Sequence, residues 1–173
     1  MRLDIDPDVA PDIVSTITDM APIEPESFDA VWSSHNIEHL YPHEVAAALG
    51  EFQRVLKPQG FAVLTLPDLQ SIAERVAEDR LLETAYVAPA GAITPLDMLF
   101  GFRPALAQGN LHMAHRTGFT ASTIEAALKD AGFAAVTVRR DGAWALWAVA
   151  SKSDADQEST RILAETLASA VDV

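Results

Sequence analysis

The sequence predicts an α/β fold with a mostly parallel sheet, because short apolar runs typical of strands alternate with stretches of helical periodicity. An Asp-Gly turn near the C-terminus adds an antiparallel hairpin at an edge of that sheet. The length of 173 residues fits one domain with its own core. With 49% hydrophobic and 21% charged residues, the composition is that of a globular protein rather than a disordered or fibrous one.

The first half of the chain predicts three strands followed by a helix and a further strand. The third strand is the clearest, because it is an apolar run between a Pro-Glu-Ser turn and a polar cluster, and we expect it inside the sheet. Apolar residues then recur at helical spacing up to Lys57-Pro58-Gln59-Gly60, which ends the helix. The expected elements are strands at 3–5, 13–17 and 28–34, a helix at 42–56 and a strand at 61–66.

The second half predicts a long insertion before the α/β pattern resumes. Residues 67–118 form this insertion; it is apolar and broken by prolines, which suggests a lid, a dimer element or a simple cover for one sheet edge. We therefore expect a domain over residues 1–151, followed by a linker and a C-terminal helix over 152–173. The expected elements are helices at 68–82, 120–131 and 158–171, with hairpin strands at 136–139 and 143–150.

Charge and composition limit the classes of partner and of chemistry that the chain can have. Twelve Lys and Arg against 25 Asp and Glu leave a net charge of −13, which repels nucleic acid and anionic membranes. The chain has no cysteine, which excludes disulfides and thiol chemistry. The N-terminus has no signal-peptide pattern, and no apolar run is long enough to span a membrane. We expect a cytoplasmic protein, and the apolar insertion makes a homodimer plausible.

Several strings resemble the class I S-adenosylmethionine-dependent methyltransferases, in particular small bacterial proteins of that family, over about residues 1–150. They are Asp4-Ile5-Asp6-Pro7, Ser27-Phe28-Asp29-Ala30-Val31, Glu38-His39-Leu40, Arg54-Val55-Leu56-Lys57-Pro58-Gln59-Gly60, and Gly118-Phe119-Thr120 leading to Ala131-Gly132-Phe133. The resemblance implies a Rossmann-like methyltransferase sheet, mostly parallel, with an antiparallel C-terminal hairpin. It also implies methyl transfer from S-adenosylmethionine to a small-molecule or sugar-like acceptor.

The resemblance also implies cofactor-binding residues at the carboxyl ends of the strands, where open α/β sheets bind ligands. Asp4 matches the acid that hydrogen-bonds the ribose hydroxyls, and its two oxygens suit that task. Asp19 would face the adenine amine, with Met20 against the ring. Ser34 would border the methionine end of the cofactor. Without the family, Asp4 would be one member of a solvated acidic loop.

The sequence departs from the family at its start. The family's first strand and glycine-rich turn come about 20 residues before the acid that Asp4 matches, and this chain begins three residues before Asp4. No two glycines are closer than eight residues, so there is no GxG string. We expect the first strand and helix to be missing, and the sheet to close directly or to receive an element from a second copy. The alternatives are a shortened form of a longer protein, or a non-catalytic binding or dimerisation module.

A cluster of His35, Asn36, Glu38 and His39 follows the third strand and is the expected catalytic group. A histidine there could take a proton from the acceptor, and alignment of the reacting groups could supply much of the rate. The same residues spell H-x-x-E-H, the string of one class of zinc peptidases, which needs both imidazoles on one helix face. Pro42 leaves little room for such a helix, so we expect no metal and treat a zinc hydrolase as the weaker alternative.

A second polar cluster lies at the end of the apolar insertion. We expect it to fold over the strand ends and bind the substrate; solvated loop residues are the alternative. Its members are Asn110, His112, His115 and Arg116. Trp144 and Trp147 are three residues apart in an expected strand, which predicts that they face opposite sides of the sheet.

Overall fold

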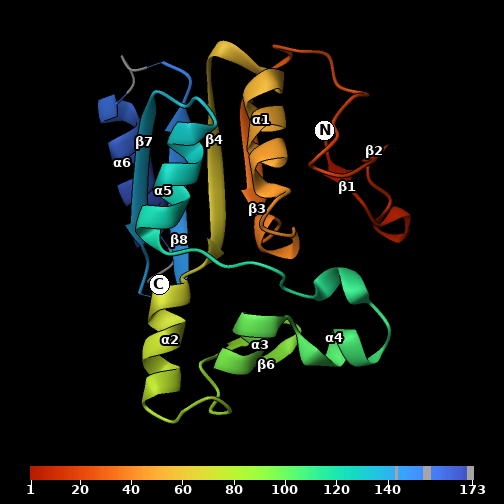
Figure 1. Ribbon diagram of the computed structural model, residues 1–173, viewed down its shortest axis with the longest axis vertical. Coiled ribbons are helices and arrows are strands. Elements are labelled where there is room, and N and C mark those ends of the chain that lie inside the picture. The colour runs from red at the N-terminus through yellow and green to blue at the C-terminus, as the bar shows by residue number, and fades with distance from the viewer. Residues whose placement is uncertain (143, 154–156, 171–173) are drawn as a thin grey trace.

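The computed structural model describes residues 1–142, 144–153 and 157–170 and contains a central four-stranded sheet in the order β3-β4-β8-β7 (Figure 1). Strand β3 runs parallel to β4, whereas β8 is antiparallel to both β4 and β7. The strands are β3 (Phe28–Ser34), β4 (Leu56–Pro67), β7 (Ala135–Arg140) and β8 (Ala145–Ser151). The α/β class and the antiparallel C-terminal hairpin are therefore confirmed. The sheet is mixed rather than mostly parallel, and among the described strands β3 lies at its edge rather than inside it.

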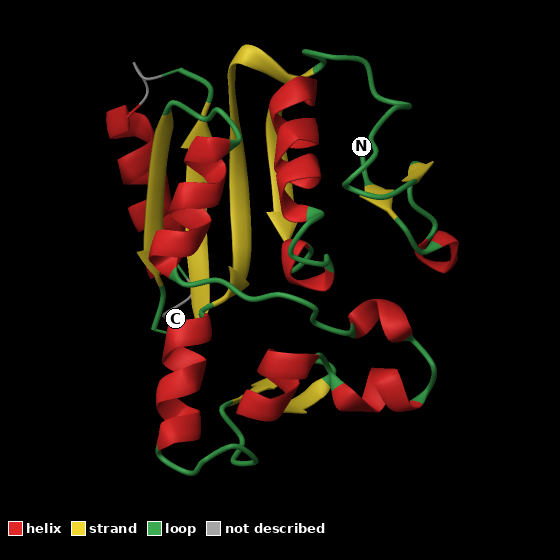
Figure 2. Cartoon of the chain, viewed as in Figure 1, coloured by secondary structure: helices red, strands yellow, loops and turns green. Residues whose placement is uncertain are grey.

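Helices cover both faces of this sheet (Figure 2). Alternate residues of β4 point to opposite faces: Leu64 packs with α1 (Val45–Val55) and α5 (Ala121–Asp130), whereas Val63 packs against α6 (Gln157–Ser169). Both faces of β4 are consequently buried, which explains its continuous apolar run. The larger core, on the α1 and α5 side, contains Leu49, Phe52, Leu64, Leu66, Ile124, Leu128 and Leu146.

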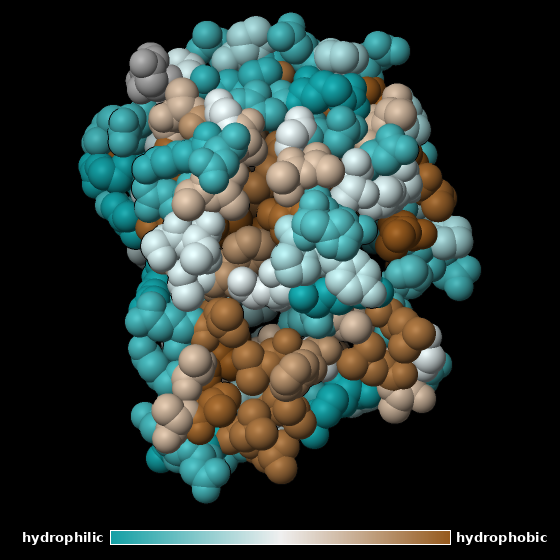
Figure 3. Space-filling view, in the orientation of Figure 1, coloured by the Kyte–Doolittle hydropathy of each residue, from teal (hydrophilic) through white to brown (hydrophobic). Residues whose placement is uncertain are grey.

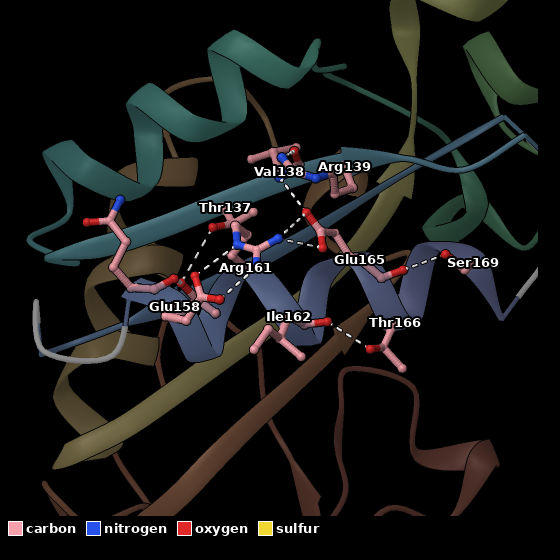
Figure 4. A network of polar contacts seen from close by, with 11 residues as sticks. Thr137, Val138, Arg139, Glu158, Arg161, Ile162, Glu165, Thr166 and Ser169 are labelled. Carbon is pink, nitrogen blue, oxygen red and sulfur yellow. Dashed lines mark hydrogen bonds and ion pairs between the residues drawn. The ribbon is translucent and has the colours of Figure 1, made fainter.

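The C-terminal helix α6 is attached to the sheet by apolar and ionic contacts. Ala164 is fully buried against the sheet. At the surface, Glu165 accepts hydrogen bonds from Arg139 of β7 at 3.1 Å and from Arg161 at 2.8 Å (Figure 4). Exposed pairs of this kind add little stability, so the apolar contacts provide most of the attachment.

The N-terminal segment does not join the central sheet. Its strands β1 (Leu3–Asp4) and β2 (Ile13–Val14) pair in parallel with each other, with η1 (Pro7–Val9) between them. Among the described residues, β1 has no ladder to β3, and the two are separated by a groove of about 500 Å³. The expectation that the sheet closes directly between these neighbours is therefore wrong. The groove is lined largely by apolar side chains, Leu3, Ile17, Met20, Phe28, Val31 and Phe52 among them.

The insertion forms a small subdomain at one end of the sheet (Figure 1). Its elements are α2 (Leu69–Ala77), β5 (Tyr86–Ala88), β6 (Gly91–Ile93), α3 (Pro95–Phe100), α4 (Arg103–Ala107) and η3 (Leu111–Met113). A parallel bridge between Asp68 and Phe119 brings its two ends together. Hydrophobic side chains gather on the surface over this part of the molecule (Figure 3). The expectation of a homodimer through this surface stays a prediction.

The element boundaries differ from expectation mainly where the chain turns. The string Lys57-Pro58-Gln59-Gly60 was expected as a turn, but it lies inside β4, where the pairing with β3 shifts register between Phe28 and Ala30. The early strands and most helices are shorter than expected. Ala143, residues 154–156 of the linker and Val171 of the last helix lie outside the described residues. No helix among the described residues is long and apolar enough to cross a membrane.

One buried carboxylate organises the insertion. Asp97 accepts hydrogen bonds from the Thr94 amide and hydroxyl at 3.0 and 2.6 Å, and its own amide donates to the Thr94 hydroxyl oxygen at 3.3 Å, which completes the capping box of α3. It also accepts from Arg103 at 2.7 Å. Burial acts to raise the pKa of Asp97, but the hydrogen bonds from Arg103 and Thr94 outweigh it and hold that pKa well below its ordinary range.

We predict that Asp97→Ala lowers the free energy of unfolding by about 2 kcal/mol, because charge-assisted hydrogen bonds are lost. The check is urea unfolding at neutral pH. Glu83→Ala, an exposed acid of the same segment, is the control and should change stability by less than about 0.5 kcal/mol. Since folding lowers the pKa of Asp97, its contribution is complete above about pH 4 and is lost as the pH falls further. Equal effects of the two substitutions would contradict this role.

Candidate active site

The site begins where β3 ends, at a sharp reversal of the backbone. His35 has a φ of 51°, in the left-handed region that non-glycine residues rarely adopt. The one-turn helix η2 (Ile37–His39) follows, with Ile37 buried in the core. This turn directs Glu38 inward, and Glu38 is only 1% exposed. A strained backbone that places a carboxylate inside the protein is typical of functional sites.

The end of the insertion is tied to this turn by its backbone. The Glu38 carbonyl accepts hydrogen bonds from the amides of Arg116 and Thr117 at 2.8 and 3.2 Å. The Arg116 guanidinium donates to the carbonyl of His39 at 3.0 Å. Segments more than seventy residues apart in sequence are therefore held side by side.

This tie brings two imidazoles together. The rings of His39 and His115 meet edge to face, with centroids 4.9 Å apart. His39 Nδ1 lies 3.1 Å from the Ala114 carbonyl oxygen, and His115 Nδ1 lies 2.8 Å from that of Met98. A carbonyl can only accept, so both Nδ1 atoms carry a proton and donate it. Burial lowers the pKa of His115, which favours its neutral form.

His35 and Glu38 form a second pair in the site. His35 Nδ1 is 3.1 Å from Glu38 Oε1, and the His35 side chain is 52% exposed whereas that of Glu38 is 2% exposed. The hydrogen bond to Glu38 raises the pKa of His35, although burial acts against it. The carboxylate also orients the ring, which leaves Nε2 of His35 available to another group.

Two cavities meet at these histidines. The larger, here called the aromatic cavity, has a volume of about 570 Å³. The smaller, the strand-end cavity, has about 300 Å³ and lies where β1, β2 and β3 end. His35 and His39 line both. The aromatic cavity also contains Glu38 and His115, together with Trp32, Tyr86, Phe102, Trp144 and Trp147.

Only some of the residues expected to bind the cofactor line the cavities or the groove. Asp4 lines both the strand-end cavity and the groove between β1 and β3. Ser34 lines that groove and the aromatic cavity. Met20 is buried at the groove. Asp19 is exposed and lines none of these three spaces; its Oδ1 accepts a hydrogen bond from the Ala21 amide. The turn between Thr16 and Asp19 thus directs this carboxylate away from them.

The expected substrate cluster is divided between the two cavities. His115 lines the aromatic cavity, whereas His112 and Arg116 line the strand-end cavity. Asn110 directly precedes η3, makes no side-chain capping hydrogen bond and lines neither cavity. Asn36, expected in the catalytic group, lines the strand-end cavity rather than the aromatic one.

Two interpretations of the sequence are corrected here. His35 lies before η2 in a left-handed conformation, so His35 and His39 do not share a helix face and the zinc-peptidase arrangement is wrong. Trp144 and Trp147 line the same cavity, because Trp144 precedes β8 and has a φ of 78°, so strand alternation does not apply to it. Sequence reasoning also missed Trp32, whose ring lies 5.8 Å from that of Trp147.

Comparisons with known proteins agree with the fold. Residues 4–64 match the family model described as a methyltransferase domain. A structure of a SAM-dependent methyltransferase from Archaeoglobus fulgidus is 14% identical and covers 87% of this chain and 74% of its own, with a TM-score of 0.56. Residues 4–64 are methyltransferase-like in sequence, and the chain has a methyltransferase-like fold. The predicted resemblance to class I methyltransferases is thereby confirmed.

Two further solved structures share this methyltransferase fold. A protein from Pyrococcus horikoshii OT3 is 16% identical, with 87% of this chain and 72% of that one covered and a TM-score of 0.55. The 1,6-didemethyltoxoflavin-N1-methyltransferase of Burkholderia thailandensis is 15% identical, with 82% and 50% covered and a TM-score of 0.50. The chain thus spans between half and three quarters of these structures. No curated protein matches the sequence.

We predict that Gly101→Ala disturbs the site although Gly101 does not line the cavities. Gly101 has a φ of 100°, and a Cβ there would lie 1.9 Å from the Met113 carbonyl oxygen. The segment that carries His115 would have to move. Gly109→Ala is the matched control, because Gly109 also has a positive φ but no atom within 4 Å of an added Cβ. Hydrogen exchange at residues 113–117 should rise in the first variant and stay unchanged in the second; equal rates would refute the contact.

Proposed function

We propose that this chain transfers a methyl group from S-adenosylmethionine to a small-molecule or sugar-like acceptor. The observation that carries the proposal is the meeting of two cavities at His35 and His39, at the carboxyl ends of the strands of a methyltransferase fold. A cofactor in one cavity and an acceptor in the other would face each other at that junction. Alignment of the reacting groups is most of what methyl transfer requires.

The strand-end cavity is the proposed cofactor site. Asp4 would accept hydrogen bonds from the ribose hydroxyls, and Arg116 supplies a positive charge in the lining for the cofactor carboxylate. The methyltransferase of known structure from Burkholderia thailandensis holds S-adenosylhomocysteine, which supports this choice of cofactor.

The aromatic cavity is the proposed acceptor site. Trp32 and Trp147 offer apolar ring faces, which suit a planar ring or a sugar ring. Residues 67–118 contribute Tyr86 and Phe102 to this cavity, and we propose that they act as a lid over the acceptor.

His35 is the proposed general base. Its Nε2 can receive the proton of an acceptor hydroxyl or amine, while Glu38 stabilises the resulting imidazolium. When bound, S-adenosylmethionine supplies a methyl group on a positively charged sulfur. The acceptor atom then bonds to the methyl carbon as the carbon–sulfur bond breaks, and its proton stays on His35. The buried carboxylate is positioned for this before any ligand arrives.

The second candidate is a binding module without catalysis. The separate pairing of β1 and β2 favours it, since among the described residues Asp4 lies on a segment that packs against the core but is not hydrogen-bonded into the central sheet. A titration with S-adenosylmethionine distinguishes the two candidate functions, because the proposed methyltransferase must bind it.

We predict that S-adenosylmethionine binds the chain and that Asp4→Ala weakens binding about tenfold or more, as expected when a charged hydrogen-bond acceptor is lost. The measurement is calorimetric titration with S-adenosylmethionine and S-adenosylhomocysteine. Asp8→Ala is the control, because Asp8 is an exposed acid of the same segment that lines none of the three spaces. Absence of binding to the wild-type chain would refute the cofactor site and favour the module.

We predict that His35→Gln lowers kcat about a hundredfold, in the range of general-base catalysis, while the affinity for S-adenosylmethionine stays within twofold. The measurement is steady-state methyl transfer with an acceptor found by screening ring-containing alcohols, phenols and amines. His43→Ala, an exposed histidine that stacks on Tyr41 outside the site, should keep the wild-type rate. An unchanged kcat in His35→Gln would show that His35 is not the general base.

A further inference from the structure

We propose that Glu38, His39 and His115 bind one divalent transition-metal ion in the wall of the aromatic cavity. One ligand atom from each residue lies within 4.8 Å of the others. All three residues line the aromatic cavity. Two imidazoles and one carboxylate form a donor set that binds zinc, iron(II) or cobalt(II) and leaves coordination positions open.

The hydrogen bonds of the two histidines prepare them as ligands. Each donates its Nδ1 proton to a backbone carbonyl, His39 to Ala114 and His115 to Met98. In the neutral ring the lone pair is then on Nε2, which is the atom that remains for a metal. Metal-binding histidines in proteins are commonly fixed by such a bond from the other nitrogen.

Glu38 supplies a second, independent observation that points to a cation. Its Oε1 is hydrogen-bonded to His35, but its Oε2 is buried and has no hydrogen-bond partner among the described residues. A buried carboxylate oxygen without a partner is costly, and a cation in contact with it removes that cost. His35, which is hydrogen-bonded to Oε1, would then orient the carboxylate whose Oε2 contacts the ion. Ligands are oriented in many metal sites by such an outer hydrogen-bond partner.

The three ligands come from segments that the backbone already fixes. Glu38 and His39 are adjacent in η2, and His115 is held next to them because Arg116 and Thr117 donate to the Glu38 carbonyl. Donors bound at about 2.1 Å in a tetrahedral site are about 3.4 Å apart, so small side-chain movements would close the site.

This site differs from the zinc-peptidase arrangement, because His35 is not a ligand and the third ligand comes from the insertion. The open positions would face the cavity and take water or an oxygen or nitrogen atom of a small molecule. The proposal does not depend on methyl transfer, because binding of the metal alone tests it without S-adenosylmethionine.

The test is titration of the metal-free full chain with Co²⁺, followed by visible absorption, and competition by Zn²⁺. We expect one equivalent of Co²⁺ per chain with the d–d bands of a low-coordinate site, displaced by one equivalent of Zn²⁺. Glu38→Gln and His115→Ala should each lose this stoichiometric binding. His43→Ala is the matched control and should bind as the wild-type chain does.

A measurement on the wild-type chain keeps the test independent of how the variants fold. In proton NMR, the Co²⁺ form should show two strongly shifted imidazole N–H signals that vanish in D₂O, one for each ligated ring, since both Nδ1 atoms carry protons. No stoichiometric uptake, a different number of such signals, or retained binding in either folded variant would overturn the assignment.

Discussion

The site depends on one buried residue, Glu38, which joins three parts of the chain. Its carbonyl holds the end of the insertion through Arg116 and Thr117, and its Oε1 orients His35. Its Oε2 is buried and has no hydrogen-bond partner among the described residues, and one of its carboxylate oxygens lies within 4.8 Å of a ring nitrogen of His39 and of His115. A carboxylate is not buried in this way unless surrounding groups compensate for the lost hydration. The strained backbone at His35 and the core packing of Ile37 supply the anchoring that keeps it there.

The insertion gains its own stability and then contributes to the site. Asp97 organises α3, and a small cluster of Ile72, Ile93 and Met98 forms the core of the insertion, with Trp144 packed against it. The bridge between Asp68 and Phe119 returns the chain to the sheet at the point where it left. An excursion with fixed ends and its own core can present residues such as His115 at a defined position, which a mobile loop could not do.

The two cavities follow from the order of the strands and from what covers them. In open α/β sheets, ligands bind in the crevice outside the carboxyl ends of the parallel strands, and the histidine cluster directly follows the end of β3 at that edge. The insertion then closes one side, which separates an aromatic space from a more polar one. The separation of β1 and β2 from β3 leaves the N-terminal residues as a distinct wall of the second space.

The sequence alone determined the α/β class, the central strands, the C-terminal hairpin and the methyltransferase resemblance, because periodicity, turn residues and short strings are local properties. It also singled out the cluster from His35 to His39, since polar residues after an apolar strand mark a sheet edge. Only the tertiary structure decided which distant residues join that cluster. His115 enters through backbone hydrogen bonds, Trp144 through a left-handed turn, and Asp19 is excluded because its own turn directs it elsewhere. Such contacts depend on how separate segments pack, and no local pattern of residues encodes that packing.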